Sequence, residues 1–174
     1  MGSEKVLVII PARGGSKGLP RKNLRKLGGV PLIAHTVRHA KGSHLVHRVV
    51  VSTDDAEIAT VARSEVAEVI MRPHDLATDS SPSEESVMHV LDQLERRDLF
   101  FPDIIVLLQC TTPLRESDDI DQAVETLLRE NADSVFSACR RHVFLWSLED
   151  EKLHSVSYDA HNREPRQAMP VQFE

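Results

Sequence analysis

The 174-residue sequence has few cysteines and few aromatic residues. Cys110 and Cys139 are its only cysteines, so we expect neither a disulfide framework nor a zinc cluster, and two reduced thiols fit a cytoplasmic protein. Met1 to Lys5 lacks the apolar core of a signal peptide, and no apolar run approaches the length that spans a membrane. The sequence therefore predicts a cytoplasmic protein without a membrane segment.

An overall excess of positive charge is also missing, because the formal net charge is −6 at pH 7. A domain that binds nucleic acid without sequence preference is usually basic, so we expect no nucleic-acid partner. The P-loop string G-x-x-x-x-G-K-[ST] and the dinucleotide string G-x-G-x-x-G are both absent. Basic residues are instead concentrated in one loop near the amino terminus, which suits a small anionic ligand.

Short apolar runs alternate with amphipathic stretches through most of the chain, which predicts an α/β fold with a mainly parallel sheet between helices on both faces, a three-layer αβα arrangement. We expect the run at 104–108, the most hydrophobic, to be the central strand. The alternation stops at Arg140, so residues 1–139 are predicted to form the core and 140–174 an extended segment. The expected strands are 6–10, 49–51, 66–71, 104–108 and 134–138.

Helix boundaries also have recognisable signals. Pro31 is expected to open the first helix, and residues 52–55 offer a cap for the second. Residues 81–84, Ser-Pro-Ser-Glu, match a capping box with proline at the first helical position, and Ser117 is expected to cap the last helix. In open parallel sheets ligands bind at the carboxyl ends of the strands, so the loops there should form the site.

The loop from Ile10 to Asn23 carries the most informative residues. It follows a buried strand, its glycines let backbone N–H groups turn toward a ligand, and its cations suit phosphate oxygens. The alternative is a basic surface loop without a ligand. The glycines and cations are Gly14, Gly15, Gly18, Arg13, Lys17, Arg21 and Lys22.

The string PARGGSKGLPRKN in this loop resembles the N-terminal signature of the acylneuraminate cytidylyltransferases, or CMP-sialic acid synthetases. The resemblance extends from about Val6 to Phe173. It implies a Rossmann-like nucleotidyltransferase fold with a projecting dimerisation segment. It also implies attack by the anomeric hydroxyl of a nonulosonic acid on the α-phosphate of CTP, which yields a CMP-sugar and pyrophosphate.

The resemblance assigns roles within the loop. Arg13 and Lys22 would be catalytic, stabilising charge on the α-phosphate and the leaving pyrophosphate. Ser16 and Lys17 would hold the β- and γ-phosphates, and Asn23 the ribose or phosphate geometry. The full set of CTP-binding residues implied is Ala12, Arg13, Gly14, Ser16, Lys17, Lys22, Asn23, Arg72 and Ser83.

Arg72 and Ser83 belong to this set because residues 72–79 resemble the family segment R-P-x-x-L-A-x-D, whose Arg and following Ser lie by the nucleotide base. Physically, telling cytosine from uracil requires a few directed donors and acceptors. By pattern alone, Arg72 could instead pair with Asp75 or Asp79, and Ser83 could serve only the start of a helix.

Residues 108–115 resemble the family string L-Q-x-T-S-P-L-R, which places Gln109 against the sugar acid or the reacting phosphate as a catalytic and sugar-binding residue. Cys110 stands at a position where proline is common in the family. The sequence spacing implies no neighbouring histidine that could activate Cys110 as a nucleophile. Pro165-Arg166-Gln167 resembles a family P-R-Q whose Arg pairs with the sugar carboxylate. By pattern alone, Arg166 would be a solvated arginine.

The family also uses Mg²⁺, held by an aspartate pair near its C-terminus that follows an N-G-x-x-Y segment. The sequence ends at Glu174 before either, so no metal ligand is expected within this chain. Either the chain continues, the favoured interpretation, or it is a shortened relative without activity. His35 and His39 are spaced i, i+4 but lack the H-E-x-x-H pattern and are expected to be solvated or capping.

Three functional hypotheses remain. The first is a CTP-dependent transferase for sialic acid, with CTP, a nonulosonic acid and a second copy of the chain as partners. The second is a transferase for another acidic sugar such as legionaminate, pseudaminate or KDO, although KDO enzymes carry an aspartate where this chain has Thr111-Thr112. The third is a catalytically inactive CTP-binding subunit.

Overall fold

The computed structural model describes residues 4–16, 18–78, 81–116, 118–141, 143–162, 164–165, 167–168 and 171–173. Two compact units make up the chain, residues 1–133 and residues 134–174. No helix among the described residues is both long and apolar enough to cross a membrane.

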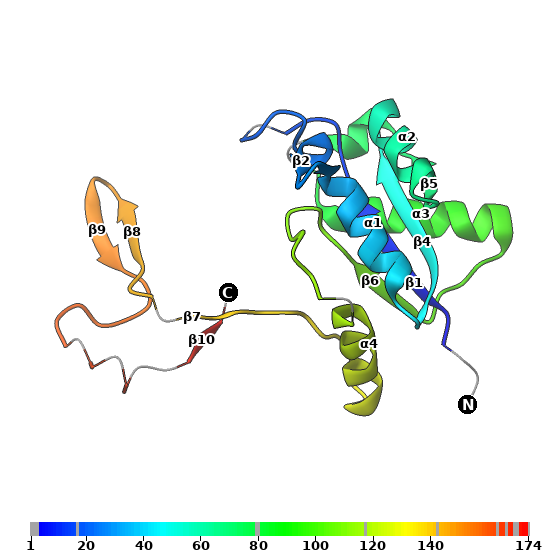
Figure 1. Cartoon of the computed structure of the whole chain (residues 1–174). Helices are drawn as coiled ribbons and strands as arrows, with labels where there is room; N and C mark the ends of the chain where they lie inside the picture. Colours follow the sequence, from blue (N-terminus) through cyan, green and yellow to red (C-terminus); the bar gives the residue numbers. More distant parts are fainter. Residues whose placement is uncertain are drawn as a thin grey trace. The chain divides into compact units, whose positions relative to one another are not determined.

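The first unit is built on a parallel sheet in the order β5-β4-β1-β6 (Figure 1). Its two inner strands, β1 and β4, run side by side, with Ile9 opposite Val50. The predicted parallel sheet is therefore confirmed. The strands are β1 (Val6–Pro11), β4 (Val46–Thr53), β5 (Glu68–Met71) and β6 (Ile104–Leu107).

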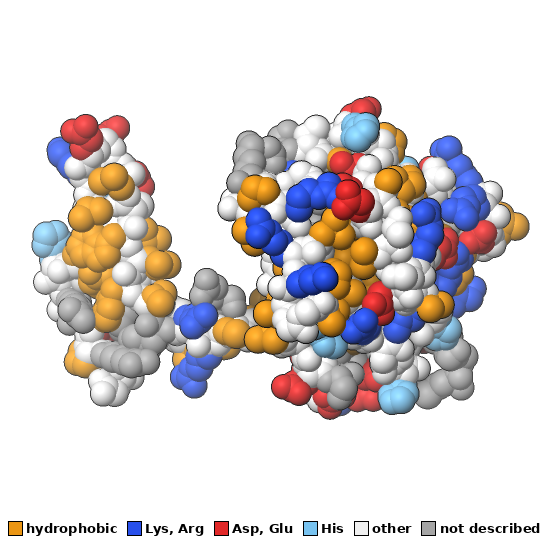
Figure 2. All heavy atoms as spheres, turned by 45° about the horizontal axis from the view of Figure 1, so that its top comes forward, with side chains coloured by type: hydrophobic (Ala, Val, Ile, Leu, Met, Phe, Trp, Pro, Cys, Tyr) orange, Lys and Arg blue, Asp and Glu red, His pale blue; other side chains and the backbone are white. Residues whose placement is uncertain are grey.

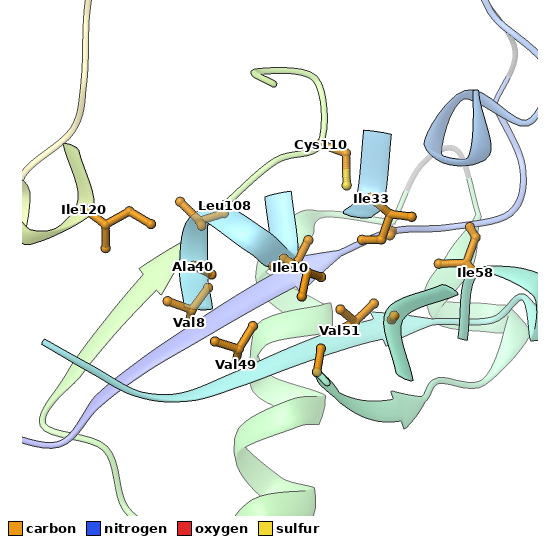
Figure 3. Close-up of a cluster of buried hydrophobic side chains, with 14 residues drawn as sticks. Val8, Ile10, Ile33, Ala40, Val49, Val51, Ile58, Leu108, Cys110 and Ile120 are labelled. Atoms are coloured by element: carbon orange, nitrogen blue, oxygen red, sulfur yellow. The ribbon is translucent and has the colours of Figure 1, made fainter. Parts of the chain in front are cut away.

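Helices cover both faces of this sheet, because successive side chains of a strand point to opposite sides. Val8 and Ile10 of β1 lie in a cluster with residues of α1 (Leu32–Gly42), α2 (Ala56–Ser64) and α4 (Asp119–Arg129) (Figure 3). Leu7 and Ile9 face the other way and pack with Val90 and Leu94 of α3 (Ser83–Asp98). The three-layer αβα arrangement is thus confirmed.

Short elements connect β1 to α1. After the loop come the 3-10 helix η1 (Lys22–Leu24) and an antiparallel pair, β2 (Lys26–Leu27) and β3 (Val30–Pro31). Gly28 and Gly29 join this pair with φ of 57° and 83°, values that suit glycine in a tight hairpin turn. A second 3-10 helix, η2 (His74–Ala77), follows β5.

Two strand predictions were wrong. Within the described residues β6 lies at the edge of the sheet and not at its centre, with Ile105 and Leu107 42% and 43% exposed. Hydrophobicity did not reveal this, because β1 and β4 are buried on both faces. Residues 134–138 form no strand, since Val135 and Phe136 are exposed and bury too little apolar surface to order a strand.

The capping predictions had mixed outcomes. Asp55 caps α2 as expected, accepting from the backbone N–H groups of Glu57 and Ile58. The capping box was wrong, because Pro82 occupies the N-cap of α3 and the hydroxyl of Ser81 instead contacts Thr78 Oγ1 and the carbonyl of Asp75. The prediction for Ser117 lies outside the described residues. The N-cap position of α4 is held by Asp118.

The second unit consists of short antiparallel pairs. Its rings pack edge to face, with Phe144 and Trp146 both against Tyr158, and Figure 2 shows hydrophobic side chains gathered over the β8–β9 hairpin. The strands are β7 (Arg140–Arg141), paired with β10 (Gln172–Phe173), and β8 (Trp146–Glu149), paired with β9 (Lys152–Ser155).

Candidate functional site

A cavity of about 610 Å³ lies where the loops after β1, β5 and β6 meet, at the carboxyl ends of these parallel strands. This is the edge of the sheet where the sequence places the site. The cavity brings together seven of the predicted site residues, namely Arg13, Ser16, Lys22, Asn23, Arg72, Ser83 and Gln109. Its other lining residues are Pro11, Gly18, Leu19, Leu76, Thr78, Ser81, Ser86, Cys110 and Thr111.

The loop after β1 is braced by hydrogen bonds to its neighbours. Arg13 Nη1 donates to the carbonyl of Thr78 over 2.6 Å, and Asn23 Nδ2 donates to the carbonyl of Arg13 over 2.9 Å. The N–H of Ala12 donates to the carbonyl of Ser52, and Ala12 is buried behind the cavity and does not line it. Asn23 thus acts on the shape of the loop through the backbone of Arg13.

Asp54 and Asp55, at the end of β4, hold the same loop. Asp54 Oδ1 accepts from the N–H of Gly14 at 3.0 Å, and Asp55 Oδ2 accepts from Arg21 Nη1 at 2.6 Å. An added Cβ on Gly14 would stand 2.6 Å from Asp55 Oδ2, so the loop and the carboxylate are in close contact. The sequence identified this aspartate pair only as helix-start residues and missed its role in the loop.

The four cations of the loop have different positions. Arg13 and Lys22 line the cavity. Arg21, in the left-handed region with φ of 57°, pairs with Asp55 and with Glu57, so it braces the loop against α2. Lys17 lies outside the described residues.

Asp55 makes the stability of the first unit depend on pH. Burial alone would raise the pKa of this carboxyl, but hydrogen bonds from Ile58, Arg21 and Glu57 outweigh burial and hold the pKa below its ordinary value. A carboxyl with a depressed folded-state pKa stabilises the fold above the unfolded-state pKa of about 4, and this stabilisation is lost as the pH falls through the folded-state pKa.

We therefore expect Asp55→Ala to destabilise the protein by about 1 kcal/mol at pH 7, as for loss of a helix cap. Urea unfolding at pH 7 and at about pH 3.5 checks this, and the gap to the unmodified protein should narrow at the lower pH. Glu57→Ala, which removes only an exposed partner of Arg21, is the control and should change stability little. An equal difference in unfolding free energy at both pH values would contradict a stabilising role for the charge of Asp55.

Arg72 is a buried cation in the cavity wall, only 8% exposed. Its backbone N–H donates to the carbonyl of Thr53, and its Nη1 donates to the hydroxyl of Ser86. Burial lowers the pKa of Arg72, Asp54 raises it and Arg13 lowers it, yet an arginine stays charged in proteins. Nε is buried and has no hydrogen-bond partner among the described residues, which costs about 1–3 kcal/mol unless a ligand accepts from it.

Gln109 lies on the opposite side of the loop cluster, after β6. Its carbonyl accepts from Arg115 Nη2 at 2.8 Å, and its side-chain Oε1 accepts from Thr111 Oγ1 at 3.3 Å. Arg115 is itself half-buried, and burial lowers its pKa. The guanidinium therefore holds the backbone of Gln109 in place, and Gln109 lines the cavity.

Cys110 is buried beside Gln109 and belongs to the same core cluster as Ile33 of α1 (Figure 3). Burial raises the pKa of its thiol to about 11, against the lowering effects of Thr36, Arg115 and Lys22. Because the thiolate is the reactive form, Cys110 is a poor nucleophile at neutral pH.

We expect a thiol reagent such as iodoacetamide to modify the exposed Cys139 quickly at pH 7.5 and Cys110 only after unfolding. Peptide mass spectrometry of briefly treated protein measures both positions. Cys139→Ser should remove nearly all fast labelling. Rapid modification of Cys110 in the folded protein would show that its thiol is accessible and ionised.

No group of three His, Cys, Asp or Glu side chains that could hold a metal ion occurs among the described residues. His35 Nε2 lies 2.9 Å from the carbonyl of Leu27, so this ring contacts the β2–β3 hairpin. Arg166, the predicted sugar-carboxylate partner, lies outside the described residues.

Sequence reasoning missed Leu19, Thr78 and Ser86 as lining residues. Ser86 had a usable signal, because it follows Ser83 by three positions and residues spaced i, i+3 share one face of a helix. Thr78 had none, since its contribution to Arg13 is a backbone carbonyl.

The model of a protein family described as "Cytidylyltransferase" matches residues 7–164 of the chain. The chain is 39% identical over 163 residues to N-acylneuraminate cytidylyltransferase A of Danio rerio, covering 94% of this chain and 36% of the relative. It is 47% identical over 122 residues to CMP-N,N'-diacetyllegionaminic acid synthase of Legionella pneumophila, covering 70% of this chain and 52% of the relative. The chain thus spans about a third to a half of the length of these two relatives.

Among solved structures, the chain is similar to a CMP:2-keto-3-deoxy-manno-octonic acid synthetase complexed with CTP. The TM-score is 0.62 at 26% identity, and the match covers 74% of this chain and 49% of that one. The fold of the first unit, with its parallel sheet and helices on both faces, agrees with this likeness.

Proposed function

Because this chain belongs to the cytidylyltransferase family, we propose that it binds CTP in the cavity at the carboxyl ends of β1, β5 and β6 and transfers its cytidylyl group to a sugar acid. One observation carries the proposal: a single cavity gathers Arg13 and Lys22 from the glycine-containing loop, the buried Arg72 and Gln109. Cations and loop N–H groups suit a polyphosphate, and a buried arginine suits a base with acceptor atoms.

In the proposed reaction the anomeric hydroxyl oxygen of the sugar acid attacks the α-phosphorus of CTP. The bond from the α-phosphorus to the bridging oxygen breaks, pyrophosphate leaves with the electron pair, and the hydroxyl proton is lost. Reactions of this type depend on positioning and on neutralising charge. Arg13 and Lys22 would stabilise the charge that develops on the α-phosphate and the leaving group, and Gln109 would orient the attacking sugar.

The remaining contacts follow from the same geometry. Ser16 would hold the outer phosphates together with Lys17, which lies outside the described residues, and Asn23 would keep the loop in shape. Arg72 and Ser83 would contact the cytosine, with the backbone around Ala12. Gly14 is a special case, because its N–H already donates to Asp54. Gly14 would therefore contribute to CTP binding by allowing the loop to pack closely against Asp55.

A nonulosonic acid is the proposed acceptor sugar, because the relatives above are named for N-acylneuraminate and for diacetyllegionaminic acid. We propose that Arg166 pairs with the carboxylate of this sugar, since a planar guanidinium matches a carboxylate bidentately. KDO is the alternative acceptor that the similarity to the KDO synthetase supports.

Cytidylyltransferases generally use a divalent metal ion, and we propose that Mg²⁺ is the one used here. Such an ion neutralises phosphate charge and lowers the cost of the leaving group. The described residues contain no group of three His, Cys, Asp or Glu side chains that would hold it.

We further propose a homodimer and a reducing, cytoplasmic setting. The β8–β9 hairpin exposes apolar side chains that suit contact with another copy, and the two cysteines are free thiols. Light scattering after gel filtration measures the mass, and a Trp146→Asp, Leu148→Asp variant should run as a monomer if the hairpin forms the contact. An unchanged dimer mass in that variant would place the contact elsewhere.

Calorimetry and pyrophosphate release together test the function. Heat on titration with CTP, and release of pyrophosphate only when a sugar acid is added, are the expected results. The panel of sugar acids is N-acetylneuraminate, legionaminate, pseudaminate and KDO. The sugar acid that supports the fastest pyrophosphate release identifies the acceptor class. CTP binding without release for any member would favour the inactive subunit. No heat with CTP would overturn the proposal.

A further inference from the structure

Arg72 and Ser86 form a pair inside the cavity wall, and the family likeness assigns a role to Arg72 but none to Ser86. Ser86 lies on the first turn of α3, is only 1% exposed, and its hydroxyl accepts from Arg72 Nη1. Both residues line the cavity. The pair joins the end of β5 to α3, and this hydrogen bond fixes how the guanidinium of Arg72 is turned.

The contact decides which edge of the guanidinium remains for a ligand. An arginine has two edges that donate two parallel hydrogen bonds, Nη1–Nη2 and Nε–Nη2. Ser86 engages Nη1, whereas Nε is buried and has no partner among the described residues. With Nη1 engaged, the Nε–Nη2 edge is the one left for a bound molecule, which would need two adjacent acceptor atoms to pair with it.

Cytosine has such a pair of acceptors, O2 and N3. Uracil has O2 beside an N3 that carries a hydrogen, so one of the two donors of Arg72 would face another donor. Pyrimidine edges are commonly read by hydrogen bonds of this kind. A site that leaves a buried donor unpaired with the wrong ligand discriminates strongly against it.

We propose that Ser86 is a positioning residue for nucleotide selection: it turns Arg72 so that the Nε–Nη2 edge pairs with O2 and N3 of cytosine and rejects uracil. The inference rests on the proposed binding of CTP and adds the group that makes the site specific for the base. Ser86 acts through Arg72 and takes no part in the chemistry at phosphorus.

The test measures the ratio of the dissociation constants for UTP and CTP by titration calorimetry. Ser86→Ala is expected to lower this ratio about tenfold, because a hydrogen bond to a charged group is lost. Ser86→Cys, which keeps the volume but removes the hydroxyl, should lower it similarly, and Ser86→Thr, which keeps the hydroxyl, should retain it. Ser64→Ala, which removes an exposed hydroxyl at the end of α2, is the matched control and should leave the ratio unchanged.

A double-mutant cycle separates positioning from direct contact. If Ser86 acts through Arg72, Ser86→Ala should have no further effect on the ratio in an Arg72→Ala background. Thermal unfolding checks that each variant is folded. If Ser86→Thr does not fold, the UTP-to-CTP ratios of Ser86→Cys and Ser86→Ala are compared instead.

An unchanged ratio in folded Ser86→Ala, with CTP still bound by the unmodified protein, would overturn this inference and leave the proposed function standing. Retention of the ratio in Ser86→Cys but not in Ser86→Ala would also overturn it, since volume would then be the cause. Absence of CTP binding by the unmodified protein would overturn both.

Discussion

Replacing Arg13 with alanine is expected to reduce pyrophosphate release by about 10²–10³-fold, the usual cost of removing one donor that stabilises transition-state charge. Arg13 lines the cavity beside Lys22, and its Nη1 bond to the carbonyl of Thr78 ties it to the loop after β5. The loss should fall mainly on kcat, because in the proposed reaction charge on the α-phosphate and on the leaving group would grow toward the transition state.

Two further variants sharpen this prediction. Arg25→Ala removes a nearby exposed cation whose Nε donates to the carbonyl of Pro20 and which does not line the cavity, so kcat should stay within about twofold. Arg13→Lys keeps the charge but not the forked donors and should recover only part of the rate. Thermal unfolding of the three variants shows whether the fold is intact, and unchanged turnover in folded Arg13→Ala would remove Arg13 from the mechanism.

Gly14→Ala should weaken CTP binding by about 10- to 100-fold, although it adds only one methyl group. The new Cβ would stand 2.6 Å from Asp55 Oδ2, a distance that real structures essentially never show, and 3.0 Å from Asp55 Cβ, which is tighter than most Cβ contacts. Either the loop moves away and loses its bond from the Gly14 N–H to Asp54, or Asp55 moves and loses its cap on α2. Overpacking of this kind costs about 1–3 kcal/mol.

Gly15→Ala provides the matched control for this change. Among the described residues, no atom beyond its two chain neighbours lies within 4 Å of the position that a Cβ on Gly15 would take, so the same substitution one residue later should be nearly silent. CTP titration and urea unfolding of both variants measure affinity and stability together. Equal behaviour of the two variants would show that contact with Asp55 does not shape the loop.

The sequence was a good guide where local chemistry decides structure. The buried run before the loop, the proline that precedes α1 and the aspartate that caps α2 all act within a few residues, and the structure contains each of them. The order of strands is a long-range property, so the hydrophobic run of β6 wrongly predicted a central position.

In the site, too, local features were predictable and long-range contacts were not. Its loops were predictable because parallel strands end at one edge of a sheet and because the motifs name their own residues. The partners were not, since the bonds Gly14–Asp54, Arg21–Asp55 and Arg13–Thr78 join positions 34 to 65 residues apart. Such contacts depend on how loops cross in space, and no spacing in the chain records them.

The bond that Asp54 accepts from Gly14 gives the protein an internal reporter. We expect this hydrogen bond to shift the amide resonance of Gly14 away from those of other glycines in a two-dimensional nitrogen–proton NMR spectrum. That single resonance would follow, without any attached label, every event that shifts the loop against the end of β4.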